Sequence, residues 1–210
     1  TGSGKTEVYL RLVERLLDDG KQVLLLVPEI NLTPQLEGRV RARFPESVVV
    51  SLHSELAEAT RERNWRAAFD GSARIVLGTR LAIFVPMPRL GLIVVDEEHD
   101  SSFKQQDGMR YSARDVAVFR ARQLGIPVLL GSATPSLESW ANAQSKRYGL
   151  LNLRERANPE ATLPTVHVLD TRKMVLTDGV SGPLIAAIGE RRERGEQSLV
   201  CLNRRGYAPV

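Results

Sequence analysis

The first residues of the chain, 1–6, have the types and spacing of a phosphate-binding loop. They read Thr-Gly-Ser-Gly-Lys-Thr, the end of a motif in which backbone N–H groups at a helix start surround phosphate. In that chemistry Lys5 reaches the terminal phosphates and Thr6 is positioned to hold Mg2+. Three small residues allow the close approach of backbone to phosphate: Gly2, Ser3 and Gly4. A flexible glycine-rich tail is the alternative, but Lys5 and Thr6 run directly into a helical pattern.

A second set of reactive residues follows a buried apolar strand. The run Asp-Glu-Glu-His-Asp occupies 96–100, directly after the apolar segment 92–95. In open parallel sheets, ligands bind at the carboxyl ends of the strands. Asp96 can therefore face a bound metal, and Glu97 can orient and deprotonate an attacking water. An acidic solvated turn is the alternative, and the phosphate loop earlier in the chain makes it the weaker interpretation.

Further polar groups stand where other predicted strands end. The segment Gly-Ser-Ala-Thr-Pro at 131–135 would bring the hydroxyls of Ser132 and Thr134 to the same edge of the sheet, within reach of both the phosphate loop and the acidic motif. Taken alone, a turn that caps the next helix explains it equally well. The segment 27–35 and the Gly-Thr-Arg run with Thr79 and Arg80 carry the hydroxyl, amide and arginine groups that hold sugar-phosphate without reading bases.

The segment 101–111 combines aromatic and cationic residues with glycine. Its aromatic residues are Phe103 and Tyr111, and its cations include Lys104. This mixture suits a mobile loop that contacts a nucleic acid strand, because bases stack on aromatic rings while cations meet phosphate. The alternative is that the two aromatic residues are ordinary packing residues that anchor a long loop. His99 either couples the acidic motif to neighbouring Gln or Thr side chains or hydrogen-bonds locally.

The elements that must position these residues alternate between helix and strand. This order predicts an α/β fold with a mostly parallel sheet and helices on both of its faces. Helical spacing of apolar residues and breaker residues predict helices at 5–17, 33–44, 57–69, 111–124, 136–145 and 183–194. Apolar or extended runs predict strands at 22–27, 48–51, 73–77, 92–95, 127–130, 166–169 and 198–202. Ser136 is the expected cap of its helix.

Composition describes an ordinary globular chain. It has 210 residues and 23.3 kDa, with 42% hydrophobic and 26% charged residues, which excludes a disordered or fibrous protein. Its longest apolar runs are far shorter than the roughly 20 residues that span a bilayer, and the N-terminus has no signal-peptide pattern, so we expect no membrane and a cytoplasmic location. A net charge of +4 permits a polyanionic partner without requiring one.

Taken in order, these motifs resemble those of superfamily-2 helicases: phosphate loop, Pro-Glu-Ile, Gly-Thr-Arg, Asp-Glu-Glu-His and Ser-Ala-Thr. More narrowly, three segments closely resemble the bacterial primosomal replication-restart helicases. They are Thr-Gly-Ser-Gly-Lys-Thr-Glu-Val-Tyr, Asp-Glu-Glu-His-Asp-Ser-Ser-Phe-Lys-Gln-Gln and Leu-Asn-Arg-Arg-Gly-Tyr-Ala-Pro. The resemblance covers nearly the whole chain.

The resemblance implies a 3′-to-5′ DNA helicase that acts at stalled or branched replication forks and hydrolyses ATP with Mg2+ between two RecA-like lobes. It implies single-stranded and forked DNA, primosome proteins and single-strand-binding proteins as partners. On this reading residues 1–155 are most of the first lobe without its first strand, 156–163 are a linker, and 164–210 begin the second lobe. We therefore expect an internal fragment of a larger protein. The segment 101–111 resembles an aromatic-rich loop that links DNA contact to hydrolysis.

Several features of those helicases have no counterpart in this sequence: the N-terminal DNA-binding region, the adenine-contacting segment, the arginine finger and the zinc-binding cysteines. Zinc is implied for the family, but the single cysteine, Cys201, offers no zinc cage and is expected to be buried in a strand. Two other functions stay open. One is a phosphate-loop enzyme without motor activity, such as a small-molecule kinase with a substrate lid. The other is an inactive polypeptide that retains only weak nucleotide or DNA binding.

Overall fold

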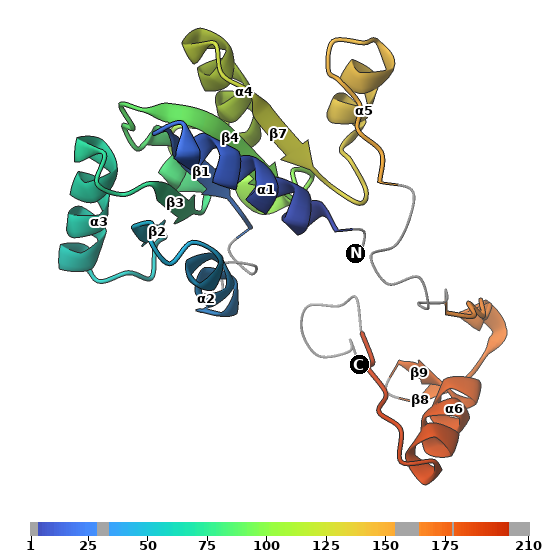
Figure 1. The fold of residues 1–210 in the computed structure, drawn as a ribbon. Helices are drawn as coiled ribbons and strands as arrows, with labels where there is room; N and C mark the ends of the chain where they lie inside the picture. Colours follow the sequence, from blue (N-terminus) through green and yellow to red (C-terminus); the bar gives the residue numbers. More distant parts are fainter. Residues whose placement is uncertain (1–3, 29–33, 154–163, 178, 202–210) are drawn as a thin grey trace. The chain divides into compact units, whose positions relative to one another are not determined.

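The structure of the chain is a computed structural model that describes residues 4–28, 34–153, 164–177 and 179–201 (Figure 1). The chain divides into two compact units, residues 1–161 and 162–210. The linker predicted at 156–163 lies outside the described residues, and the assignment of the two units to helicase lobes stays a prediction. Among the helices of the described ranges, none has the length and apolar character needed to cross a bilayer.

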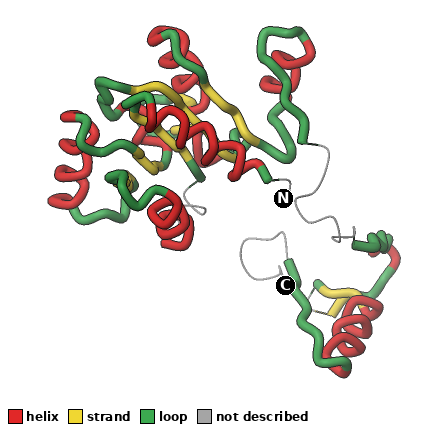
Figure 2. The backbone as a smooth tube through the Cα atoms, in the orientation of Figure 1, coloured by secondary structure: helices red, strands yellow, loops and turns green. Residues whose placement is uncertain are grey.

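The first unit is built on a parallel sheet of five strands, in the order β2-β3-β1-β4-β7. Figure 2 shows these strands in yellow at the centre of the unit. Their bounds are Gln22–Leu26 for β1, Val49–Leu52 for β2, Ile75–Gly78 for β3, Leu90–Asp96 for β4 and Val128–Gly131 for β7. Each lies within three residues of a predicted strand, so the predicted α/β class with a parallel sheet is confirmed.

The described residues of this unit form five α-helices, and four of them cover the two faces of the sheet. The helix bounds are Lys5–Asp18 for α1, Pro34–Arg43 for α2, Glu58–Asp70 for α3, Ala113–Leu124 for α4 and Leu137–Gln144 for α5. Alternate residues of β1 divide the core, as the two-residue period of a strand requires. Val23 and Leu25 pack with α1 and α2 in one cluster, whereas Leu24 and Leu26 pack with α3 and α4 in the other.

Short elements between β3 and α4 were not predicted. A 3-10 helix, η2, covers Arg80–Phe84, and a second one, η3, covers Ser101–Phe103. The strands β5 (Lys104–Gln105) and β6 (Tyr111–Ser112) then pair antiparallel, so the predicted loop is a short hairpin. Because 111–112 pair as β6, α4 begins two residues later than predicted. Two-residue strands carry no readable period, which is why the sequence did not reveal them.

The second unit holds the 3-10 helix η4 (Thr171–Lys173), the strands β8 (Leu176–Thr177) and β9 (Val180–Ser181), which pair antiparallel, and the helix α6 (Gly182–Glu193). The predicted helix is confirmed, but the strand predicted at 166–169 is wrong: Val166 and Val168 are 78% and 90% exposed and form no strand. The residues described at 198–201 are also not a strand, and Cys201 is exposed rather than buried. Apolar side chains alone do not make a strand when no neighbour pairs with them in the described part of the unit.

Candidate nucleotide and nucleic-acid site

The start of α1 and the acidic motif meet at the carboxyl edge of the sheet. Lys5 Nζ donates a hydrogen bond of 2.8 Å to Glu97 Oε1, although 92 positions separate the two residues. Gly4 stands at the helix N-cap with a φ of 84°, a left-handed conformation that glycine adopts without strain. The positive end of the helix therefore lies beside a lysine and a carboxylate. The predicted convergence of Lys5 and Glu97 is present in the structure.

Asp96 ends β4 and is held by two donors. Its Oδ1 accepts a hydrogen bond of 3.2 Å from the Tyr9 hydroxyl and one of 3.1 Å from the backbone N–H of Glu97. Burial raises the pKa of Asp96, and the positive charge of Lys5 acts against that rise. Burial also raises the pKa of Tyr9, with a further contribution from the Asp96 charge. Tyr9 is therefore a neutral hydroxyl that can serve as a donor throughout the neutral pH range.

The backbone of Glu97 has a φ of 48°, which is unusual for a residue other than glycine. A non-glycine residue in this region costs roughly 1–3 kcal/mol and persists only where its surroundings impose it. Such strained residues cluster at functional sites. At this position a turn follows β4, in which the Asp100 N–H donates a hydrogen bond of 2.8 Å to the Glu97 carbonyl. The Glu97 side chain is directed toward Lys5.

His99 links the acidic motif to the Ser-Ala-Thr segment. Its Nδ1 lies 2.7 Å from Ser132 Oγ and 3.6 Å from Glu97 Oε2, and its Nε2 lies 3.4 Å from Thr134 Oγ1. The direction of these hydrogen bonds depends on the tautomer of the imidazole ring. His99 thus contacts a threonine, as one of its two expected roles requires, and its role in coupling stays a prediction. Ser136, directly after this segment, caps the next helix as expected, because its Oγ accepts the Ser139 N–H at 3.2 Å.

The Gly-Thr-Arg segment is more enclosed than the sequence suggested. Thr79 is only 4% exposed, so its side chain does not offer a surface contact to DNA in this structure. The Arg80 guanidinium donates hydrogen bonds of 2.9 Å to the Ser102 carbonyl and 3.3 Å to the Lys104 carbonyl. Arg80 therefore ties η2 to the hairpin, and this structural role was missed by sequence analysis.

The burial of Phe103, just before the hairpin, contradicts the base-stacking role expected of this residue. This side chain is 2% exposed and belongs to the core cluster beneath α3 and α4, so it cannot stack on a base, and the packing interpretation applies. Tyr111 is half-buried, packs edge-on against Phe84 with ring centroids 5.0 Å apart, and has its pKa raised by burial. The exposed surface of the hairpin carries Lys104 and, at 72% exposure, Met109.

Some predicted residues lie outside the described part of the chain. They are Gly2 and Ser3 of the phosphate loop and residues 29–33 of the Pro-Glu-Ile segment. Thr6 lies in the first turn of α1 and is half-buried. A lysine, a helix N-terminus, a hydroxyl and a half-buried carboxylate form the donor set that a nucleotide with Mg2+ requires. Among the described residues, no three His, Cys, Asp or Glu side chains are grouped as the ligands of a metal ion would be.

Three residues that shape this site were not predicted from the sequence: Tyr9, Glu98 and Arg114. Tyr9 follows Lys5 by four positions, so both lie on the same face of α1, and this spacing was the available signal. Glu98 and Arg114 are the two buried members of an ion pair, with nitrogen and oxygen 3.2 Å apart. Nothing in the spacing of 98 and 114 indicates that pair, because it depends on how α4 packs.

Residues 1–143 match the family model described as DEAD/DEAH box helicase. The whole chain is 50% identical to "Replication restart protein PriA" of Haemophilus influenzae, of which it covers 28%. It is 44% identical, over 99% of its length, to the protein of the same name from Bacillus subtilis, of which it covers 26%. The chain thus spans little more than a quarter of these relatives. A solved structure of RecG bound to a three-way DNA junction is 25% identical, with a TM-score of 0.48 over 68% of this chain and 18% of that one.

Proposed function

The chain belongs to the DEAD/DEAH box helicase family, and we propose that it is part of an ATP-hydrolysing DNA helicase. Its parallel sheet with helices on both faces is the RecA-like fold expected from the sequence. The activity that we infer is ATP-dependent 3′-to-5′ unwinding or translocation at stalled or branched forks during replication restart. The similarity to proteins named replication restart protein supports this inference.

The observation that carries the proposal is the ion pair between Lys5 and Glu97. The lysine of a phosphate loop and the general base of an acidic motif are charged partners at 2.8 Å. A phosphate that reaches the N-terminus of α1 competes with Glu97 for Lys5, because both are anions. Binding of the nucleotide would therefore release the Glu97 carboxylate to orient a water and accept its proton. This exchange makes the base available only when the phosphates are in place.

ATP and Mg2+ are the cofactors that this site would take. Lys5 would hold the terminal phosphates, Thr6 and Asp96 would hold the metal, and the small residues of the loop would let the backbone approach: Gly2, Ser3 and Gly4. The metal supplies charge neutralisation to the phosphates. Tyr9 would fix the orientation of the Asp96 carboxylate through its 3.2 Å hydrogen bond.

DNA is the proposed polymer, in single-stranded and forked form. The proposed contacts and coupling groups surround the carboxyl edge of the sheet: Arg80, His99, Lys104, Tyr111, Ser132 and Thr134. Thr79 and Phe103, also expected there, support this surface from within, since both are buried. Primosome proteins and single-strand-binding proteins are the proposed protein partners, and the cytoplasm, where the chromosome is replicated, is the proposed location. A small-molecule kinase is not favoured, because the family match and the strand-end hydroxyls both support a motor.

The test uses the full-length protein with Lys5→Ala and Glu97→Gln. Loss of a phosphate contact or of a proton acceptor typically lowers hydrolysis about 100-fold or more. Lys5→Ala should also weaken nucleotide binding, whereas Glu97→Gln should leave the nucleotide bound. Lys21→Ala and Glu7→Gln are matched controls, because both side chains are exposed and neither contacts the acidic motif. DNA-stimulated ATPase close to the unmodified rate in either test variant would disprove the assignment.

A further inference from the structure

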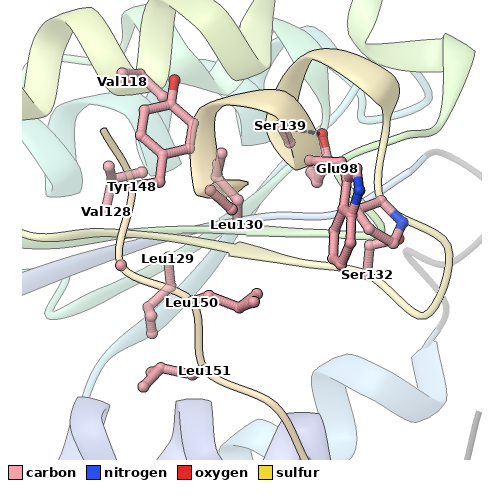
Figure 3. Close-up of a pocket in the computed structure, with 14 residues that line it drawn as sticks. Glu98, Val118, Val128, Leu129, Leu130, Ser132, Ser139, Tyr148, Leu150 and Leu151 are labelled. Atoms are coloured by element: carbon pink, nitrogen blue, oxygen red, sulfur yellow. Dashed lines mark hydrogen bonds between the residues drawn. The ribbon is translucent and has the colours of Figure 1, made fainter. Parts of the chain in front are cut away.

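Glu98 is buried in the middle of the acidic motif, and its carboxylate receives four hydrogen bonds. Its side chain is 1% exposed. Oε1 accepts the backbone N–H of Ser136 at 2.7 Å, and Oε2 accepts the hydroxyls of Ser136 and Ser139 at 3.0 and 2.9 Å. The fourth donor is Arg114 Nη1 at 3.2 Å. Figure 3 shows Glu98 and Ser139 together at one end of the cavity that runs beside β7.

A buried carboxylate persists only where its charge is compensated and its lone pairs are used. Arg114 supplies the compensating charge from a side chain that is itself only 9% exposed. The same guanidinium nitrogen donates to Ser136 Oγ at 2.7 Å, so carboxylate, guanidinium and hydroxyl form a closed triangle. The position of Ser136 is therefore determined by two charged groups from different parts of the chain.

The helix α5, which begins after Ser136, has one further polar attachment, a long ion pair of 3.7 Å between Glu138 and Arg114, and little apolar packing. None of its residues is buried, and Leu137 and Trp140 are 85% and 46% exposed. A helix without a buried apolar face gains little stability from packing. The bonds from Glu98 to Ser136 and Ser139, in its cap and first turn, are therefore the principal anchor of α5.

The anchor also fixes the Ser-Ala-Thr segment, because that segment joins β7 to α5. On one side, the Glu98 N–H donates to the Gly131 carbonyl at 3.0 Å. On the other side, the Glu98 side chain holds Ser136. The segment between these two points carries Ser132 and Thr134, the hydroxyls that contact His99. Glu98 thus holds both ends of the segment.

We propose that Glu98 and Arg114 are positioning residues that hold α5 and the Ser-Ala-Thr segment against His99 and Glu97. Arg114 lies in the first turn of α4, three positions after Tyr111 at the end of the hairpin. The pair therefore also links the helix that follows the hairpin to the acidic motif. This inference rests on the proposed function, in which those hydroxyls take part in DNA-stimulated hydrolysis. Neither residue touches the nucleotide or the attacking water.

The first test replaces one donor at the anchor in the full-length protein. Ser139→Ala removes one of the four hydrogen bonds to Glu98. Ser145→Ala is the matched control at the C-cap of the same helix, because the Ser145 hydroxyl donates to the Asn142 carbonyl and not to Glu98. Hydrogen exchange of the backbone amides of α5 should accelerate about fivefold in Ser139→Ala, the effect of one typical hydrogen bond, and not in the control. The DNA-stimulated kcat should fall about tenfold, while the KM for ATP stays within about twofold, because misplacement of a supporting group affects the reaction and leaves phosphate binding intact.

The second test uses the cation. Arg114→Met leaves the Glu98 carboxylate without its cationic partner, whereas Arg114→Lys keeps a cationic donor. Arg122→Met, on the exposed face of α4, is the control. The kcat should fall in Arg114→Met by at least as much as in Ser139→Ala, recover in part in Arg114→Lys, and stay unchanged in the control. Because Arg114→Met removes a buried charge partner and can unfold the protein, Ser139→Ala is the decisive variant.

Two outcomes would overturn the inference. Unchanged exchange of α5 in Ser139→Ala would show that Glu98 is not its anchor, and faster exchange with a normal kcat would show that the anchor has no part in hydrolysis. A fall in kcat that is matched by a rise in KM would indicate general damage to the nucleotide site. An unmodified protein without DNA-stimulated hydrolysis would instead overturn the proposed function itself.

Discussion

At the scale of single residues, position 131 requires glycine because Tyr9, which supports Asp96, occupies the space of a side chain there. A Cβ on residue 131 would stand 1.5 Å from the Tyr9 hydroxyl oxygen and 3.3 Å from Asp96 Oδ1. The need for glycine is therefore steric, since Gly131 has no positive φ. An alanine would push Tyr9 away from the carboxylate that it orients. The glycine of the Gly-Ser-Ala-Thr-Pro segment and the tyrosine of α1 thus constrain each other although they are 122 positions apart in the sequence.

We predict that Gly131→Ala lowers the free energy of unfolding by about 1–3 kcal/mol, the usual effect of overpacking a dense site. Tyr9→Phe should restore part of that loss in the double variant, because it removes the oxygen at 1.5 Å but leaves the ring carbon at 2.7 Å. Denaturant titration of the two single variants and the double variant measures this. Gly149→Ala is the control, since nothing lies within 4 Å of its Cβ position. Additive effects of the two substitutions would contradict the steric explanation.

Phe103, just before the hairpin, and Met109, within it, allow packing to be distinguished from surface contact. Phe103→Ala should destabilise the protein by about 3–5 kcal/mol, as is typical of a buried phenylalanine, because this side chain is 2% exposed. Met109→Ala should change the stability by less than about 0.5 kcal/mol, because it is 72% exposed. Thermal unfolding compares the two. A stable Phe103→Ala variant that has lost only its DNA affinity would restore the stacking role expected from the sequence.

At the scale of elements, the sequence predicted what depends on local period and failed where pairing decides. The run 22–27 is apolar at every position from Val23, and this predicted a strand that is buried on both faces. The phosphate loop, the acidic motif and the Ser-Ala-Thr segment were expected at one edge of the sheet. The loop precedes a helix that its period predicts, and the other two follow apolar strands. The run 166–169 is apolar at every position except His167 but forms no strand, because a strand also needs a partner that local sequence does not specify.

Within the acidic motif, the sequence could not distinguish three neighbouring carboxylates. Asp96 and Glu97 were assigned to the site from their place after the strand, and both lie there with Lys5. Glu98 is chemically identical to Glu97, yet it turns into the protein and meets Arg114. The left-handed backbone at Glu97 reverses the chain at this point, so that neighbouring side chains diverge. This divergence is a tertiary property, because it depends on where α4 and α5 offer donors.

The contact between α2 and β2 gives a pH dependence that can be measured. Glu37 on α2 accepts a hydrogen bond of 2.6 Å from the Ser51 hydroxyl on β2 and pairs with Arg41. Burial alone would raise the pKa of Glu37, but the hydrogen bonds from Ser51 and Arg41 outweigh it and lower that pKa. A lowered pKa in the folded state means that this contribution to stability is fully present above the ordinary glutamate pKa and is lost as the pH falls through the folded-state value.

We therefore predict that Glu37→Gln reduces the acid sensitivity of the first unit. Between about pH 5 and pH 3, the free energy of unfolding should fall less steeply in this variant than in the unmodified protein, because one carboxylate with a lowered pKa is gone. Urea titrations at several pH values measure this slope. Glu46→Gln, at an exposed position, is the control. A slope equal to that of the unmodified protein would show that the bond between α2 and β2 is too weak to matter.

At the scale of the whole molecule, the two units differ in the sheets and helices that their described residues form. The first unit contains the five-stranded sheet and the Lys5 to Glu97 pair, so all hydrolytic groups proposed here come from one unit. The second unit contributes a two-stranded sheet and α6, and most of its side chains are exposed. The chain covers only 28% of its relative from Haemophilus influenzae. Unwinding is therefore a property proposed for the longer protein.

The net charge of +4 and the placement of the cations predict how the protein would bind DNA. At the carboxyl edge of the sheet, the candidate contacts are hydroxyls, the tied Arg80 and the exposed Lys104 of the hairpin. None of these groups lies on a helix that is positioned to enter a major groove, and such a helix is the usual means of reading base sequence. Binding should therefore depend on phosphate charge and not on base order.

We predict that the full-length protein binds unrelated single strands of equal length with similar affinity, and that each phosphate contact costs about 2- to 3-fold in affinity between 50 and 200 mM salt. Lys104→Ala should lower the slope of affinity against salt concentration by the amount of about one phosphate contact, and to the same extent for every strand. Lys21→Ala is the control, because Lys21 precedes β1 and so lies at the opposite, amino edge of the sheet. Fluorescence anisotropy with three strands at both salt concentrations measures these quantities. A strong preference for one sequence, with little effect of salt, would mean that base contacts dominate and that the edge of the sheet is not the binding surface.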